Sequence, residues 1–210
     1  MVAVTSLARR PFAPVPVLTG IAFTLSWIIG LAIPAPSPRL TASGATIQAA
    51  LAGHGGQVMA NFVFTEGLPA LGLAVISVYL ARYTRHPRWV LGAGGFAAAV
   101  SFTQCVLGIA LARATAPATA HLLYEAVNRL DGVKMLALAV LALAAAAATL
   151  LPRWLRWLGV ALGISITASG VAYLFLLDSL AWLAYVAGVL LLAFIPAAGI
   201  VLGRTCREPA

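Results

Sequence analysis

Two carboxylates, Glu66 and Asp131, stand at the start of two long apolar segments of this 210-residue chain. A glycine follows each of them, and a Pro-Arg-Trp tripeptide begins 21 residues later, at Pro87 and at Pro152. A carboxyl group enclosed among apolar helices can hold a basic partner, bind a ligand or, when burial keeps it protonated, donate a proton. These two acids are therefore the first candidates for a catalytic or ligand-binding role.

The composition indicates that the elements carrying these acids lie in a membrane. Hydrophobic residues make up 62% of the chain and charged residues only 9%, whereas a soluble domain has about 25% charged residues. The net charge is +8, but no basic stripe with interleaved aromatic residues is present, so nucleic acid is not a predicted partner. The lipid bilayer is the predicted partner.

Six apolar runs are long enough to cross a bilayer, which takes about 20 residues. The predicted fold class is therefore all-α, an integral membrane bundle of six transmembrane helices in one domain, residues 1–210. The first run follows Arg9-Arg10, and we interpret it as a retained helix because it lacks a clean small-x-small cleavage site. The predicted spans are roughly 15–34, 59–82, 89–112, 132–151, 155–177 and 180–203.

The distribution of basic residues predicts the orientation. Nine arginines lie in the N-terminal segment, the second and fourth loops and the C-terminal segment, against four basic residues in the other three loops. The positive-inside rule then places both termini in the cytoplasm of a bacterial inner membrane. In the first outer loop we expect a short helix that stops at Gly53, followed by a turn at Gly55-Gly56. In the third we expect an interfacial helix over 119–132, running into the fourth span with a bend at Gly132.

A repeat is visible in the middle of the chain. Residues 66–89 align without gaps to residues 131–154, with ten of 24 positions identical. The alignment predicts two equivalent helical hairpins, 66–113 and 131–178, arranged as a parallel repeat; the alternative is chance identity in a composition rich in Leu and Ala. Twenty-one helical residues span about 31 Å, close to the thickness of the hydrocarbon core. Both acids should therefore lie near the outer boundary.

Polar residues collect at this outer level. Charged groups near lipid normally face inward and pair, so we predict that Lys134 contacts Glu66 or Asp131 and that Arg113 pairs with Asp178. The candidate ligand-binding residues are Asn61, Arg113, Tyr124, Glu125, Asn128 and Lys134. Neither Cys105 nor Cys206 belongs to a metal-ligand or CxxC pattern, and no metal or cofactor is predicted.

Four interpretations of this polar cluster stay open. The ion pairs could simply fasten the helices, or they could line an outer pocket that binds an amphiphilic or small ligand. A third interpretation is an intramembrane enzyme acting on a lipid or isoprenoid by terpene-cyclase-like acid chemistry. In that case Glu66 would donate the proton, and Asp131 or Asp178 would be its catalytic partner. The fourth is a small-solute transporter, which the parallel repeat favours.

The second Pro-Arg-Trp tripeptide continues as "LPRWLRWLGVALGI" (151–164) and is followed by two closely spaced apolar runs. This pattern resembles a group of small bacterial polytopic membrane proteins classed as domains of unknown function, over residues 130–203. The resemblance implies a six- or seven-helix membrane fold and supplies no activity.

Overall fold

The computed structural model describes residues 13–148 and 151–205, and within these ranges every regular element is helical. Arg9, Arg10, Cys206 and Arg207, which entered the sequence predictions, lie outside the described residues, as does 149–150 of the fourth predicted span. The elements are α1 (Pro14–Ala32), α2 (Gly44–Leu51), α3 (Gly55–Phe62), the π-helical turn η1 (Val63–Gly67), α4 (Leu68–Ala81), α5 (Pro87–Leu111), α6 (Pro117–Ala146), α7 (Arg153–Leu174), the short 3-10 helix η2 (Asp178–Leu180) and α8 (Leu183–Thr205).

Five of these segments are long and apolar enough to cross a membrane. They are Pro14–Ala32, Gly55–Ala81, Pro87–Leu111, Arg153–Leu174 and Leu183–Thr205. The fourth predicted span falls in the 30-residue helix α6, which is not among the five. The last 18 residues of α6 carry three charged side chains, Arg129, Asp131 and Lys134, and this charge is what separates α6 from the other long helices.

The two predictions for the outer loops are partly confirmed. The short helix is present as α2, and Gly53 follows it with a positive φ of 77°, which glycine adopts without steric cost. The turn predicted at Gly55-Gly56 is wrong, because these glycines begin α3. Helix formation at this point lets α3 run through η1 into α4 as one membrane-length segment.

α6 joins the predicted interfacial helix and the predicted fourth span without interruption. Gly132 lies at a close crossing with α7: a methyl group there would be 2.7 Å from the Gly170 carbonyl oxygen and 2.5 Å from the Leu174 backbone nitrogen. The glycine therefore allows the close approach of two backbones, and the bend expected there stays a prediction.

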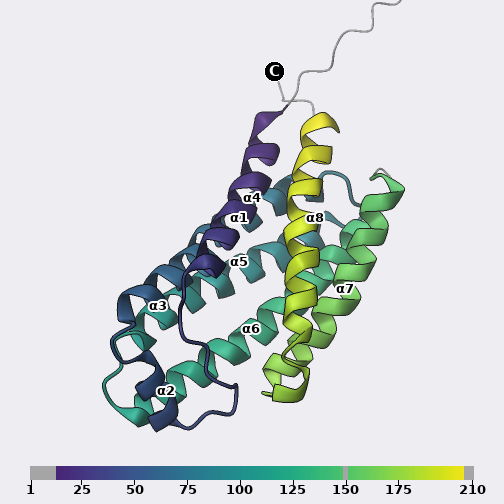
Figure 1. Ribbon diagram of the computed structural model, residues 1–210. Coiled ribbons are helices and arrows are strands. Elements are labelled where there is room, and N and C mark those ends of the chain that lie inside the picture. The colour runs from purple at the N-terminus through teal and green to yellow at the C-terminus, as the bar shows by residue number, and fades with distance from the viewer. Residues whose placement is uncertain (1–12, 149–150, 206–210) are drawn as a thin grey trace, which may run out of the picture.

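The helices form one bundle with an outer end and an opposite end (Figure 1). We call outer the end that holds α2, the start of α6 and η2; the last turn of α8 lies at the opposite end. α1 and α8 run side by side, α6 packs against α5 and α7, and α4 packs against α1 and α5. A small satellite core of Ile47, Leu111 and Ala120 joins α2 to the outer ends of α5 and α6.

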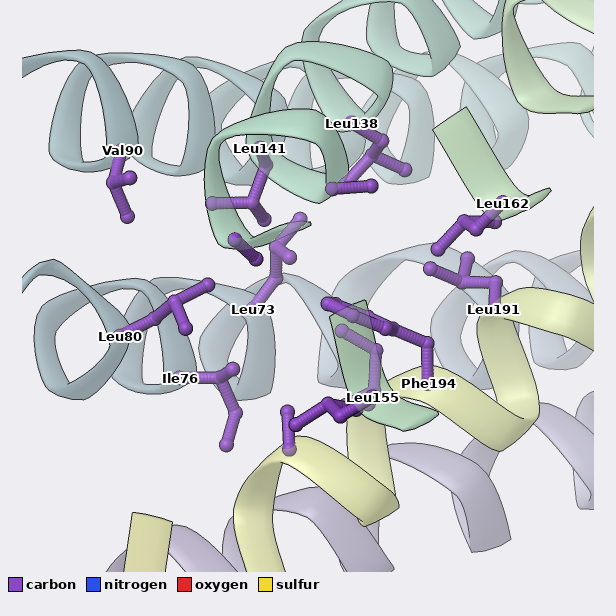
Figure 2. Packing of buried hydrophobic residues seen from close by; sticks show 14 of the residues in the cluster. Leu73, Ile76, Leu80, Val90, Leu138, Leu141, Leu155, Leu162, Leu191 and Phe194 are labelled. Atoms are coloured by element: carbon purple, nitrogen blue, oxygen red, sulfur yellow. The ribbon is translucent and has the colours of Figure 1, made fainter. Parts of the chain in front are cut away.

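The main core fills the space between the long helices with aliphatic side chains and two phenylalanines, Phe23 of α1 and Phe194 of α8. Figure 2 shows these side chains converging, among them Leu73, Leu138, Leu162, Leu191 and Phe194. Many large apolar side chains on the outer faces of the helices are exposed, for example Leu71, Ile164 and Val189. An apolar interior with an equally apolar exterior is what a bundle surrounded by lipid requires.

Candidate functional site

Three charged side chains meet between η1 and α6, and we call them the ionic centre: Glu66, Asp131 and Lys134. The Lys134 ammonium lies 2.7 Å from each Glu66 carboxylate oxygen and 2.6 Å from Asp131 Oδ1. The predicted contact of Lys134 is therefore confirmed, and it is made with both acids. Only 7% of the Lys134 side chain and 10% of the Glu66 side chain is exposed, against 18% for Asp131.

α5 closes the ionic centre from a third side with two polar residues. The Ser101 hydroxyl donates to Glu66 Oε2 and, at 3.2 Å, to the Glu66 carbonyl oxygen. The Gln104 amide nitrogen lies 3.1 Å from the Val127 carbonyl oxygen and 3.3 Å from Asp131 Oδ1. Gln104 thus contacts the centre as well as the backbone of α6, beyond the helix–helix hydrogen bonding that its sequence position predicts.

The π-helical turn that carries Glu66 has an identifiable local cause. The Leu68 N–H bonds to the Val63 carbonyl, so the next carbonyl, that of Phe64, would accept from position 69. Pro69 has no N–H to donate there, and the Ser26 hydroxyl of α1 donates to the Phe64 carbonyl instead, at 2.6 Å. The turn is therefore stabilised by a neighbouring helix, and such π turns are frequent at functional sites.

The charges of the ionic centre do not balance. Two carboxylates share one ammonium, so the centre carries a formal charge of −1 when all three groups are ionised. The Lys134 ammonium has three N–H donors, and its three short contacts to carboxylate oxygens use all of them. A further positive charge at this place would be electrostatically favourable because the surroundings are apolar.

A small cavity adjoins the ionic centre, with Thr65, Ser101 and Lys134 on its polar side and Trp27 and Leu191 among its apolar walls. Its volume of about 20 Å³ is sufficient for one water molecule. Sites for drug-sized ligands are typically about 300–1,000 Å³. This cavity thus offers room for water or a similarly small species, and none for the chain of an amphiphile or an isoprenoid.

The predicted pair between Arg113 and Asp178 is wrong. Asp178 instead accepts hydrogen bonds from the first outer loop, from the Leu40 N–H at 2.8 Å and from the Thr41 hydroxyl. The hydrogen bond from Thr41 holds the pKa of the Asp178 carboxyl below its usual value. Both Arg113 and Asp178 are exposed, so the strong attraction expected for a buried pair does not act on them.

The other predicted ligand-binding residues also lie outside the ionic centre. The Asn61 amide donates to the Gly30 carbonyl at the end of α1, at 2.9 Å. The Tyr124 hydroxyl donates to the Pro38 carbonyl of the first outer loop at 2.5 Å. Two more residues bond within their own helix: Asn128 to the Tyr124 carbonyl, and Glu125 to Arg129. These contacts hold the outer loop and helix ends in place.

Ser26, the donor to the π turn, was missed by the sequence predictions. A serine in an apolar helix is a weak signal, because its hydroxyl most often bonds within its own helix. Pro69 was the stronger signal: a proline inside a helical run predicts a distortion about one turn earlier. That distortion lies at the residues that carry Glu66.

Fold and site together define the class of protein, a helical, multi-pass membrane protein that has, within residues 13–148 and 151–205, five helical segments able to cross a bilayer and a buried ionic centre. Comparison with protein-family models, with curated proteins and with solved structures gives no match. The resemblance of residues 130–203 to bacterial membrane proteins of unknown function therefore stays a prediction. The function has to be inferred from the geometry and charge of the ionic centre.

Proposed function

We propose that this chain is a six-span protein of the bacterial inner membrane, with both termini in the cytoplasm and the outer end toward the periplasm. The five apolar segments support it. α6 supplies the sixth span, since Asp131 and Lys134, two of the three charges near its middle, contact each other within the bundle. The excess of arginines at the cytoplasmic boundary supports the orientation.

The parallel repeat belongs to the same proposal. Both Pro-Arg-Trp tripeptides stand at the start of a helix: Pro87 is the first residue of α5, and Pro152 directly precedes α7. Proline is favoured at these places because the first turn of a helix needs no N–H donor. Trp89 and Trp154 are both exposed, as expected for side chains that anchor a helix at the headgroup level.

The function that the geometry supports best is the binding of a small, positively charged ligand at the ionic centre, as a small-solute transporter requires. The single observation that carries this proposal is the charge imbalance: Lys134 is held between Glu66 and Asp131, and one negative charge is left over in an enclosed site. Ion pairs that only fasten helices need no such excess. Ionisable groups within a membrane are functional candidates for the same electrostatic reason.

The size of the adjoining cavity, about 20 Å³, favours this function over the two alternatives with larger ligands. An amphiphile or an isoprenoid would need a site larger by an order of magnitude. A water-sized species matches the existing room, and Lys134 lines both this cavity and the ionic centre.

The test uses the full chain in lipid nanodiscs with ammonium, methylammonium and sodium chlorides as probes, followed by uptake of radiolabelled methylammonium into proteoliposomes. We expect a saturable rise of the thermal unfolding midpoint with at least one cation, or with protons. The rise should be lost in Asp131→Asn and kept in Glu125→Gln, which removes a partly exposed acid from the same helix. If no cation and no change of pH acts through Asp131 or Glu66, the proposal is refuted. Uptake distinguishes transport from binding alone.

A further inference from the structure

We infer that the cation bound by the ionic centre is a proton, and that Asp131 is the carboxylate that takes it up. This inference rests on the proposed cation-binding function and specifies its ligand. In this step a proton from solution bonds to a carboxylate oxygen of Asp131, no other bond changes, and the formal charge of the centre rises from −1 to 0.

The carboxylate oxygen atoms of Glu66 and Asp131 differ in the number of donors that contact them. Both oxygens of Glu66 accept from Lys134, and Oε2 also accepts from Ser101. Asp131 uses only Oδ1, which contacts Lys134 and Gln104; within the described part of the chain its Oδ2 accepts no hydrogen bond. A proton on Glu66 would displace an existing donor, whereas a proton on Asp131 Oδ2 displaces none.

A second, independent observation points to the same place. Gln104 is only 1% exposed, and its side-chain oxygen Oε1 has no hydrogen-bond partner in the described structure. The nitrogen of the same amide is 3.3 Å from Asp131 Oδ1. An unpaired buried acceptor costs about 1–3 kcal/mol. Ionised Asp131 offers this acceptor no donor, whereas protonated Asp131 adds one O–H donor to the same group of polar atoms.

Charged and titratable groups face Asp131 from three elements. Lys134 lies on its own helix, Glu66 on η1, and the Tyr173 phenol on α7 is close enough to Asp131 to interact electrostatically. α5 contributes the neutral Gln104, and Cys105 of the same helix lies toward Glu66. Lys134 is thus the only base in this set, and one proton brings the set to neutrality with Glu66 still paired.

A metal ion fits this geometry less well than a proton. Calcium and magnesium take about six or more oxygen ligands, and three oxygens of the centre are already in contact with the Lys134 ammonium. A proton needs a single oxygen atom. Its uptake also weakens the attraction of Asp131 for Lys134, so that Lys134 is left with Glu66 as its one charged partner.

The experiment is infrared difference spectroscopy of the full chain in nanodiscs as the pH is changed, in the carboxylic-acid C=O stretching region. We expect one carboxylic-acid band that changes with pH in the wild type, is lost in Asp131→Asn and persists in Glu125→Gln. The conservative variants assign it: Asp131→Glu should displace the band in frequency, and Glu66→Asp should not.

The converse results overturn the inference. Displacement of the band by Glu66→Asp alone would assign the proton to the other acid, and absence of a band while ammonium or sodium still stabilises the protein would make the ligand a different cation. Both of these results leave the proposed cation binding intact. If Asp131→Asn does not fold, the frequency shift in Asp131→Glu decides the assignment alone.

Discussion

The ionic centre and the outer end of the bundle use the same kinds of charged residue with different consequences. In the centre, Glu66 and Lys134 are almost completely enclosed and touch at 2.7 Å. At the outer end, Glu125 and Arg129 meet at the same distance, 2.7 Å, with about half of the Arg129 side chain exposed. Equal distances therefore do not imply equal energies, because solvent screens the second pair and not the first.

The comparison also distinguishes residues that hold neighbouring segments together from residues that could bind a ligand. Asp178, Tyr124 and Asn61 each bond to the backbone or side chains of a neighbouring segment at the outer end, and these contacts fix the positions of loops. The ionic centre instead holds unbalanced charge next to a water-sized cavity that Lys134 lines. Removing single groups from each region should reveal the difference.

The largest effect is expected for Lys134→Met, which leaves Glu66 and Asp131 without a counter-charge in an apolar environment. Removal of one partner from a buried ion pair typically destabilises a protein by about 3–5 kcal/mol. The measurement is unfolding by denaturing detergent in mixed micelles. Arg129→Met, an exposed base of the same helix, is the matched control and should cost far less. Equal losses for the two variants would contradict the comparison.

The second effect concerns the π turn that carries Glu66. Ser26→Ala should leave the Phe64 carbonyl without its donor and cost about 1–3 kcal/mol, the usual penalty for an unsatisfied buried group. Thr103→Ala is the control, because the exposed Thr103 hydroxyl bonds only within its own helix, to the Ala99 carbonyl. Detergent-induced unfolding measures both, and a loss as small for Ser26→Ala as for Thr103→Ala would show that the turn does not depend on α1.

A smaller effect is expected at the exposed pair. Glu125→Gln should change the free energy of unfolding by only about 0.3–0.5 kcal/mol, as usual for an i,i+4 ion pair on a helix surface. The change should shrink further when the salt concentration is raised, because salt screens exposed charges. A loss above about 2 kcal/mol, several times the value expected for such a pair, would mean that Glu125 is coupled to the ionic centre.

The smallest effect is expected at Asp178, and it depends on pH. Its pKa is lower in the folded chain than in the unfolded chain, chiefly because Thr41 donates to it. The contact therefore stabilises the fold above the unfolded pKa, about 3.9 for aspartate, and this contribution is lost as the pH falls through the folded value. The thermal midpoint difference between wild type and Thr41→Val should accordingly vanish in acid. A difference that is the same at every pH would contradict this account.

Much of the architecture was predictable because it follows from hydropathy over long runs. Spans 15–34, 89–112, 155–177 and 180–203 agree with α1, α5, α7 and α8 to within a few residues. The contact of Lys134 with the two acids was also predictable, since a charge in an apolar helix must find a partner. An error occurred where a short-range signal is ambiguous, as at Gly55, which begins a helix rather than a turn.

The sequence by itself determined that this chain forms apolar helices of membrane length and that its few charges must pair. Only the tertiary structure decided which charges do so, because pairing depends on how helices distant in the chain are rotated and how deeply they are set. It brought Glu66, Lys134 and Asp131 together, left Arg113 apart from Asp178, and placed Ser26 against a π turn. The local sequence pattern predicts that a charged side chain in an apolar helix has a partner, and the packing of the helices determines which residue that partner is.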